Sequence, residues 1–585
     1  MKSSRKTFLE RTRLWLTAID PLPQLALIGL VCGLLTGLVI IAFRLLIETA
    51  QAGLLPLGDP ENYEGLSPIL RLLIPIVGAL LIGLIFDMIA RETRQMGIVH
   101  VMERFMYHEG RLPPANAAWQ FIGAALSIIS GHSVGREGPG VHLGAATGSL
   151  MGQSLRLPDN SNRVLISCGA AASIAASFNT PLAGVIFAME VIAREYSLAG
   201  FTPVILAAVS ATALSRLVFG DEPVFTIPLL DMGSLWELSF VLLSGLLIGA
   251  LAALFIRMLR KFTGLWRQRR LWQRTLLAGV ITGIAAVFVP QIMGVGYDTI
   301  NLTLAGQAGF VLLLVIVFFK MLATSACVGL GLPGGFIGPT LVIGACAGGA
   351  LGIVAQSVFP GQVTGPAFYA VIGMAAMMGA VLQAPLAALI AIIELTADPH
   401  LILPGMLAVI TAGLTCSELF KQPAVFDMLL RERGLDFRND PVAQSLRIEG
   451  VVRVMEQNFV LTPARVPARE ARKMLRENPL WIVLLSESGR QPTVMPASNL
   501  AQYLAENEAS LSRNGLIDLM DIPAQRSQAA LIDKRATLQE SLEVLDRGNL
   551  DMACVATEAE QPSTIVGIVS RQDIEACYSA ASQTT

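Results

Sequence analysis

The residues best suited to chemistry lie in one short stretch inside long apolar sequence. Residues 135–139 read Gly-Arg-Glu-Gly-Pro, and small residues continue the pattern to Gly148. An Arg beside a Glu is costly at membrane depth, which indicates a functional role. Pro139 suits the first turn of a helix, and the amides and positive dipole end of a helix N-terminus bind anions. We therefore predict that the Glu137 carboxylate occupies an anion site when ionised, and leaves it when protonated or displaced by a diffusible anion.

A second copy of this pattern follows in the other half of the chain. Seven residues recur two hundred positions later, at 335–352: Gly135, Gly138, Pro139, Gly144, Ala145, Gly148 and Gly152. The segment 179–190 recurs as 383–394. The Arg and Glu of the first copy have apolar counterparts in the second, so one half alone carries the titratable group. Two motifs that recur in order at nearly the same offset predict a duplicated membrane fold, in which helix N-termini from both halves converge on one site.

The composition is that of a polytopic membrane protein. The 585 residues are 53% hydrophobic and 15% charged, and their mean hydropathy is +0.61, which is too apolar for a soluble protein of this length. The net charge of −2 says nothing about partners, and no basic patch with interleaved aromatics indicates nucleic acid as a partner. The seven cysteines are scattered and form no C-x-x-C pair, so we expect small buried residues and no metal site. We expect neither a cofactor nor enzymatic activity.

The apolar sequence is divided into many segments. Residues 1–20 are basic at their start, which predicts a cytoplasmic N-terminus, and a first apolar run covers about 25–46. Several of the later segments are shorter than the ~20 residues that span a bilayer, which predicts broken helices meeting near the midplane. They lie at residues 69–90, 118–131, 162–176, 181–193, 200–219, 236–257, 274–295, 309–329, 337–358, 367–381, 383–396 and 401–416.

These motifs resemble the CLC family of voltage-gated chloride channels and anion/proton antiporters. The resemblance rests on residues 135–139, on Gly-Gly-Phe-Ile-Gly-Pro at 334–339 and on two Pro-Leu-Ala segments, and it runs from about residue 21 to 435. It implies an all-α, inverted-repeat CLC membrane fold, with halves at roughly 21–220 and 235–435. It also implies a homodimer in a bacterial plasma (inner) membrane, with an anion pathway through each subunit.

The resemblance carries roles onto individual residues. Glu137 matches the external gating glutamate of the family. The positions that match anion-binding residues or the helix ends around them are Met96, Gly97, Arg136, Gly138, Phe336, Ile337 and Phe426.

Two of these positions lack the hydroxyl group that the family commonly has there. Met96 replaces a serine, and its thioether cannot donate a hydrogen bond to an anion. Methionine at this position resembles the fluoride-transporting branch, although members of that branch usually end soon after the membrane fold; the alternative is that Met96 only fills space. Phe426 matches the tyrosine that closes the inner side of the pathway, and a one-residue gap would move this match to Val425.

The position of the internal proton-transfer glutamate holds Val191, which resembles the channel branch. We therefore predict passive chloride conduction gated by Glu137. The first alternative is chloride/proton exchange, with Glu190 or water as the inner proton route, and another is transport of a different anion such as fluoride. A further alternative is a sensing protein whose membrane part barely conducts.

Ordinary soluble sequence begins near residue 440. Buried strands are expected at 480–485, 553–556 and 565–569, with a helix at 538–545. Residues 567–574 resemble the closing strand and helix start of a CBS motif, and a degraded copy precedes them. The resemblance implies a cytoplasmic CBS pair within 440–585, at about 450–505 and 517–580. In such domains the positions of Ser570 and Asp573 can hold the ribose of an adenine nucleotide; the alternative is a purely structural, dimerising module.

Overall fold

The computed structural model describes eleven parts of the chain, and the basic N-terminal segment 1–20 lies outside them. The chain divides into two compact units, Met1–Leu157 with Ser161–Phe437 and Pro158–Asn160 with Arg438–Thr585. The described residues are 21–157, 159–196, 198–221, 225, 234–360, 363–435, 450–485, 492–507, 515–534, 536–557 and 564–582.

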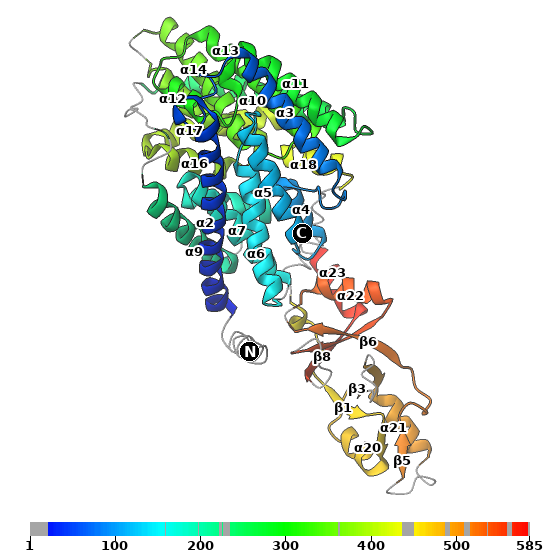
Figure 1. Cartoon of the computed structure of the whole chain (residues 1–585). Helices are drawn as coiled ribbons and strands as arrows, with labels where there is room; N and C mark the ends of the chain where they lie inside the picture. The colour runs from blue at the N-terminus through cyan, green and yellow to red at the C-terminus, as the bar shows by residue number, and fades with distance from the viewer. Residues whose placement is uncertain are drawn as a thin grey trace. The chain divides into compact units, whose positions relative to one another are not determined.

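The first unit is built from α-helices, joined by short 3-10 and π segments, in the part that is described (Figure 1). Its α-helices are α2 (Pro21–Leu54), α3 (Pro68–Asp87), α4 (Gly97–Tyr107), α5 (Pro114–Ile129), α6 (Glu137–Ser154), α7 (Asp159–Phe178), α8 (Pro181–Phe187), α9 (Leu198–Phe219), α10 (Glu237–Gly264), α11 (Leu271–Phe288), α12 (Tyr297–Leu304), α13 (Phe310–Leu330), α14 (Ile337–Val358), α15 (Pro366–Leu382), α16 (Pro385–Thr396), α17 (Ile402–Leu414) and α18 (Val425–Glu432). The short segments are η1 (Pro56–Gly58), η2 (Ala188–Ala193), η3 (Pro290–Ile292), η4 (Pro399–Leu401) and η5 (Thr415–Leu419).

The prediction of a polytopic membrane protein is confirmed. Eight described helices are long and apolar enough to cross a membrane. They cover Pro23–Leu54, Pro68–Asp87, Gly200–Phe219, Glu237–Gly264, Leu271–Phe288, Phe310–Leu330, Ile337–Val358 and Pro399–Leu419. Shorter apolar helices cover Pro181–Ala193, Pro366–Leu382 and Pro385–Thr396, as expected of a fold with broken helices.

Proline sets many of these helix boundaries. Helices α3, α5, α8, α15 and α16 each begin with a proline, which lacks the N–H that a first turn would leave unpaired. Proline also divides the apolar segment 274–295, which is not a single helix. Helix α11 ends at Phe288 and Pro290 opens a 3-10 turn, because proline cannot donate to the helical ladder.

Corresponding helices pack in the same way in the two halves. Helix α2 packs on α9 in the first half, and α10 packs on α17 in the second. Between the halves, α8 packs on α16. Figure 1 shows α2 running beside α5 and α6, the helices that lead to and from the Arg-Glu motif.

The second unit is an α+β structure. Its six-stranded sheet has the order β1-β3-β4-β6-β7-β8, and β2 pairs with β5 separately. In each half of the sheet one parallel pair, β1 with β3 or β6 with β7, is followed by an antiparallel neighbour. The strands are β1 (Phe459–Pro463), β2 (Arg465–Pro467), β3 (Trp481–Leu485), β4 (Thr493–Pro496), β5 (Leu516–Asp518), β6 (Ser527–Asp533), β7 (Met552–Ala556) and β8 (Ile565–Ser570). The helices are η6 (Val451–Arg453), α20 (Ala468–Leu475), α21 (Ala497–Glu506), α22 (Leu538–Gly548) and α23 (Arg571–Ser582).

Candidate functional site

The loops that precede α6 and α14 are joined by their backbones at equivalent positions of the two repeats. The Gly135 N–H donates to the Gly335 carbonyl at 2.7 Å, and the Gly335 N–H donates to the Gly135 carbonyl at 2.8 Å. A Cβ on Gly335 would lie 2.7 Å from the Gly138 nitrogen, closer than side chains are found. Glycine is therefore needed for this approach, which brings the N-termini of α6 and α14 together.

The Glu137 carboxylate is completely buried at this junction. Its Oε1 accepts a hydrogen bond from the Tyr297 hydroxyl at 2.5 Å, and its Oε2 accepts one from the Gly338 N–H at 3.1 Å. Gly338 lies in the first turn of α14, so the carboxylate binds the helix end of the second repeat. The sequence-based expectation placed it at the amides of its own helix, α6; packing of the two halves decides otherwise. Gly135 leaves room for it, since a Cβ there would lie 2.1 Å from Oε2.

Tyr297 belongs to the site and was missed in the sequence analysis. It begins α12 after Gly296, whose φ of +89° is in the left-handed region. Its ring packs edge-on against Phe225 at 5.7 Å, and the Arg136 guanidinium lies over it, 5.2 Å from the ring centroid. A signal that could have revealed it is the Gly-Val-Gly turn directly before a tyrosine in apolar sequence.

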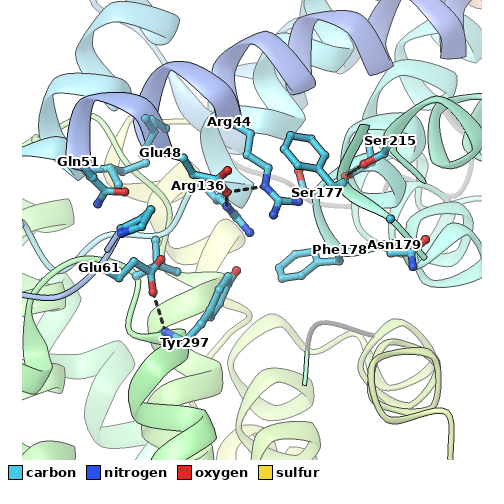
Figure 2. A pocket seen from close by; sticks show the side chains of 17 residues that line it. Arg44, Glu48, Gln51, Glu61, Arg136, Ser177, Phe178, Asn179, Ser215 and Tyr297 are labelled. Atoms are coloured by element: carbon cyan, nitrogen blue, oxygen red, sulfur yellow. Dashed lines mark hydrogen bonds and ion pairs between the residues drawn. The ribbon is translucent and has the colours of Figure 1, made fainter. Parts of the chain in front are cut away.

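One side of the junction opens into a cavity of about 370 Å³, which we call the Arg136 cavity. Figure 2 shows the side chains of Arg44, Glu48 and Arg136 turned toward one another in it. Glu48 lies 2.6 Å from Arg44 and 3.5 Å from Arg136, and the buried Nε of Arg136 has no hydrogen-bond partner. The other residues that line the Arg136 cavity include Gln51, Glu61, Phe178, Asn179, Ser215 and Tyr297. The unpaired Arg136 Nε–H can donate a hydrogen bond to an anion in this cavity.

Glu61 lies on the loop between α2 and α3 and also lines the Arg136 cavity. Its Oε2 accepts the Tyr297 N–H at 3.3 Å (Figure 2). Burial, and then the charge of Asp298, raise the pKa of Glu61 to about 7. This carboxyl therefore titrates near neutral pH beside the gate.

A second cavity, of about 350 Å³, contains most of the predicted anion-binding residues; we call it the Phe336 cavity. Its lining includes Met96, Gly97, Gly138, Phe336, Ile337 and Phe426. Four arginines, Arg94, Arg267, Arg274 and Arg433, line it together with one acidic residue, Glu432. This excess of positive charge attracts anions.

Glu137 lies between residues that line these two cavities. Arg136 lines the first and Gly138 lines the second, while Glu137 between them is fully buried. The structure thus brings together six of the predicted anion-binding residues and places Arg136 on the other side of the carboxylate.

Phe426 packs against Phe336 in the lining of the Phe336 cavity. Their ring centroids are 5.3 Å apart, and Phe426 is 2% exposed. The lining contains Phe426 and not Val425, which favours the first of the two possible matches to the family tyrosine. The Phe426 ring thus stands where the resemblance implies a hydroxyl, and it packs against a second apolar ring.

The Gly97 amide makes a hydrogen bond within the protein. It donates to Oε1 of Gln120 at 2.7 Å, and Gln120 also lines the Phe336 cavity. Gln120 comes from α5 and was not among the predicted residues. Nothing in its sequence context, an apolar helix after Trp119, singles it out.

Glu190 and Glu394 make reciprocal contacts between the repeats. The Glu190 carboxylate accepts the Leu386 and Ala387 N–H groups at 3.3 and 2.7 Å, at the start of α16. The Glu394 carboxylate accepts the Leu182 and Ala183 N–H groups at 3.0 and 2.7 Å, at the start of α8. Each glutamate thus caps the helix of the other half, and Glu190 lines neither cavity described above. The role of Glu190 that these contacts show is that of a helix cap.

His100, His132 and His142 are buried, and so are the cysteines whose side chains are described. Nδ1 of His100 lies 2.9 Å from Nε2 of His142, and both rings are buried. The described residues contain no group of three potential metal ligands. The cysteines whose side chains are described are buried and free, as predicted for small core residues.

Ser570 and Asp573 are bonded to each other in the second unit. The Ser570 hydroxyl donates to Oδ2 of Asp573 at 2.6 Å, and the Ser570 N–H donates to the same oxygen at 2.9 Å. The Asp573 N–H donates back to the hydroxyl at 3.2 Å. This arrangement satisfies the start of α23, as a capping box does.

Comparison with known proteins agrees with this geometry. The family model for the voltage-gated chloride channel matches residues 78–417. A ClcB-like protein of Ralstonia nicotianae is 34% identical over 381 residues, which are 64% of this chain and 89% of that protein. The H(+)/Cl(-) exchange transporter ClcA of Vibrio cholerae is 33% identical over 322 residues, 53% of this chain and 69% of that protein.

Among solved structures, a slow cyanobacterial Cl-/H+ antiporter superposes with a TM-score of 0.62 at 26% sequence identity, over 70% of this chain and 97% of that one. The helices, the duplicated motif and these relatives lead to one conclusion: the chain belongs to the CLC family of voltage-gated chloride channels and related anion transporters, with the inverted-repeat membrane fold of that family and an α+β unit at its C-terminal end.

Proposed function

We propose that this protein is a homodimer that conducts chloride across a bacterial inner membrane, through a pathway in each subunit that Glu137 gates. The observation that carries the proposal is the buried carboxylate itself. It lies between two arginine-lined cavities and is held by the Tyr297 hydroxyl and an α14 amide. An ion that takes its place would find the Gly338 N–H at the start of α14, because a halide and a carboxylate oxygen both accept hydrogen bonds.

The proposal includes the pathway itself. The anion would pass from the Arg136 cavity to the Phe336 cavity, where Met96, Phe336 and Phe426 form a site with few hydroxyl groups. The helix ends at Gly138 and Ile337 supply dipoles there. Because Met96 resembles the methionine of the fluoride-transporting branch, transport of another anion such as fluoride is the alternative.

Conduction without coupled protons is the first form of the proposal. Val191 is buried and apolar and has no proton to transfer. The carboxylate of the neighbouring Glu190 is bound to the start of α16 and does not reach the Phe336 cavity. Chloride/proton exchange is the second form. It is supported by the exchanger and antiporter among the relatives, and by Glu432, a carboxylate that lines that cavity.

The C-terminal unit is proposed to be a cytoplasmic CBS pair with a structural role, and both termini are proposed to lie in the cytoplasm. Its two successive strand arrangements support a paired module. The mutual hydrogen bonds of Ser570 and Asp573 support capping over nucleotide binding.

The test is flux from liposomes loaded with KCl, with external chloride and external pH recorded together. Wild type, Glu137→Ala and Glu432→Gln are compared. Chloride efflux without proton movement supports conduction. Chloride-driven proton movement that Glu137→Ala abolishes establishes exchange, and its loss in Glu432→Gln assigns the inner route. No chloride flux, with fluoride passing instead, moves the proposal to a different anion, and no anion flux at all refutes it.

A further inference from the structure

We propose that Gln120 supplies the anion with the hydrogen-bond donor that Met96 cannot supply in the Phe336 cavity. The proposal rests on the proposed function, because it concerns the anion that passes through that cavity. Gln120 becomes a specificity-determining residue for a small inorganic monoanion.

The orientation of the Gln120 carboxamide follows from its partner. The Gly97 N–H lies 2.7 Å from the carboxamide atom assigned as Oε1. A backbone N–H is a donor only, so the atom that faces it must be the oxygen, and the opposite atom must be the NH₂ group. The donor end of Gln120 therefore points away from Gly97.

That donor end has no partner within the protein. The Gln120 side chain is 1% exposed, and its Nε2 is buried without a hydrogen bond. Buried donors are nearly always paired, because an unpaired one loses its hydration without compensation. Gln120 lines the Phe336 cavity, so a buried NH₂ group that no protein atom accepts is available to donate to an anion there.

The surroundings match an anion. Gln120 lines the same cavity as Met96 and Phe426, the two positions where the resemblance implied hydroxyl donors. Arg94, Arg267 and Arg274 line it as well and provide positive charge without filling the place of a short neutral donor. The Gly97 N–H is used in the hydrogen bond to Gln120, so it is not available to an anion. The NH₂ group of Gln120, a side chain of α5, replaces this backbone donor of α4.

A purely structural role is the competing explanation. Gln120 would then only fasten α5 to the start of α4 through the Gly97 amide. That role needs the oxygen of the carboxamide and gives the NH₂ group nothing to do. The two explanations differ in what a hydroxyl at position 96 would restore.

The experiment titrates chloride into the purified full-length protein in detergent and measures the heat of binding, with flux measured in parallel. Gln120→Met keeps the length of the side chain and removes both polar atoms. We expect chloride to bind about tenfold more weakly or worse, as for the loss of a hydrogen bond to an ion. Gln422→Met is the matched control, because Gln422 is buried and lines neither cavity. It should bind chloride as wild type does.

The double variant Met96→Ser/Gln120→Met decides between the two explanations. A serine hydroxyl next to the missing carboxamide should recover most of the affinity if a donor was lost. It should recover none if a helix contact was lost. Unchanged affinity in Gln120→Met, or no recovery in the double variant, overturns the inference even though wild type transports chloride. A wild type that neither binds nor carries an anion overturns the proposed function instead.

Discussion

The Tyr297 hydroxyl donates to Glu137 at 2.5 Å, from a residue 160 positions away in the chain and in the other repeat. A second donor, the Gly338 N–H, completes the clamp at 3.1 Å. These two donors hold the Glu137 carboxylate in place. Under the proposed function, an anion that enters the site must compensate for the loss of these two bonds.

Replacement of Tyr297 by Phe should weaken the closed state. A hydrogen bond to a charged group contributes about 1.5–3 kcal/mol, so chloride flux at neutral pH should rise about tenfold or more. Chloride efflux from liposomes measures it. Tyr369→Phe is the control. The Tyr369 hydroxyl, on α15, donates to Glu237, on α10, at 2.9 Å, elsewhere in the unit. Equal flux in Tyr297→Phe and wild type would mean that the hydroxyl does not hold the gate.

Glu137→Gln should raise chloride flux, because a neutral carboxamide oxygen accepts the Tyr297 and Gly338 hydrogen bonds more weakly than a carboxylate does. Chloride efflux from liposomes measures this change. The side chain keeps nearly the same size, and the elution profile of the variant on gel filtration checks its folding. Flux equal to that of wild type would contradict a gating role for the Glu137 charge.

Glu61 should make the protein less stable at high pH. Its pKa is raised to about 7 by burial and by Asp298, so the folded protein favours the protonated form and loses stability as the pH rises through that value. Glu61→Gln removes this loss. The difference in thermal midpoint between the variant and wild type should be small at acid pH and favour the variant above neutral pH. A difference that does not change with pH contradicts the assignment.

Gly335→Ala should damage both folding and transport. A Cβ there would lie 2.7 Å from the Gly138 nitrogen, and overpacking typically costs about 1–3 kcal/mol. Thermal unfolding and chloride flux measure the effect. Gly413→Ala is the matched control, because a Cβ at Gly413 meets nothing within 4 Å and alanine favours the helix. Similar behaviour of the two variants would show that the backbone pairing of the loops is not needed.

Glu190→Gln and Glu394→Gln should have similar effects. Each change weakens two amide contacts at the start of a helix in the other repeat, so each should lower the thermal midpoint and leave any proton movement unchanged. The liposome assay with pH recording tests the second part. If Glu190→Gln alone stopped proton movement, Glu190 would be the inner proton route.

The sequence by itself determined the class of the protein and the parts of its site. Long apolar segments require a membrane, and prolines and glycines mark where the helices begin and where loops approach closely. The recurrence of the 135–152 pattern at 335–352 showed that two helix ends should meet. These features depend on residue type and spacing, which can be read along one chain. The extent of α11 was less predictable, because Pro290 overrides apolar sequence that continues beyond it.

The tertiary structure alone decided which groups touch. Glu137 binds Gly338 and Tyr297, which are 201 and 160 positions away. Gln120 accepts a hydrogen bond from the Gly97 amide, 23 positions away. Such partners are set by how the helices pack. The type of a side chain does not reveal which distant group lies beside it. The same packing made Glu190 a cap and left the Gln120 NH₂ group unpaired, because each depends on which backbone amide lies beside the side chain.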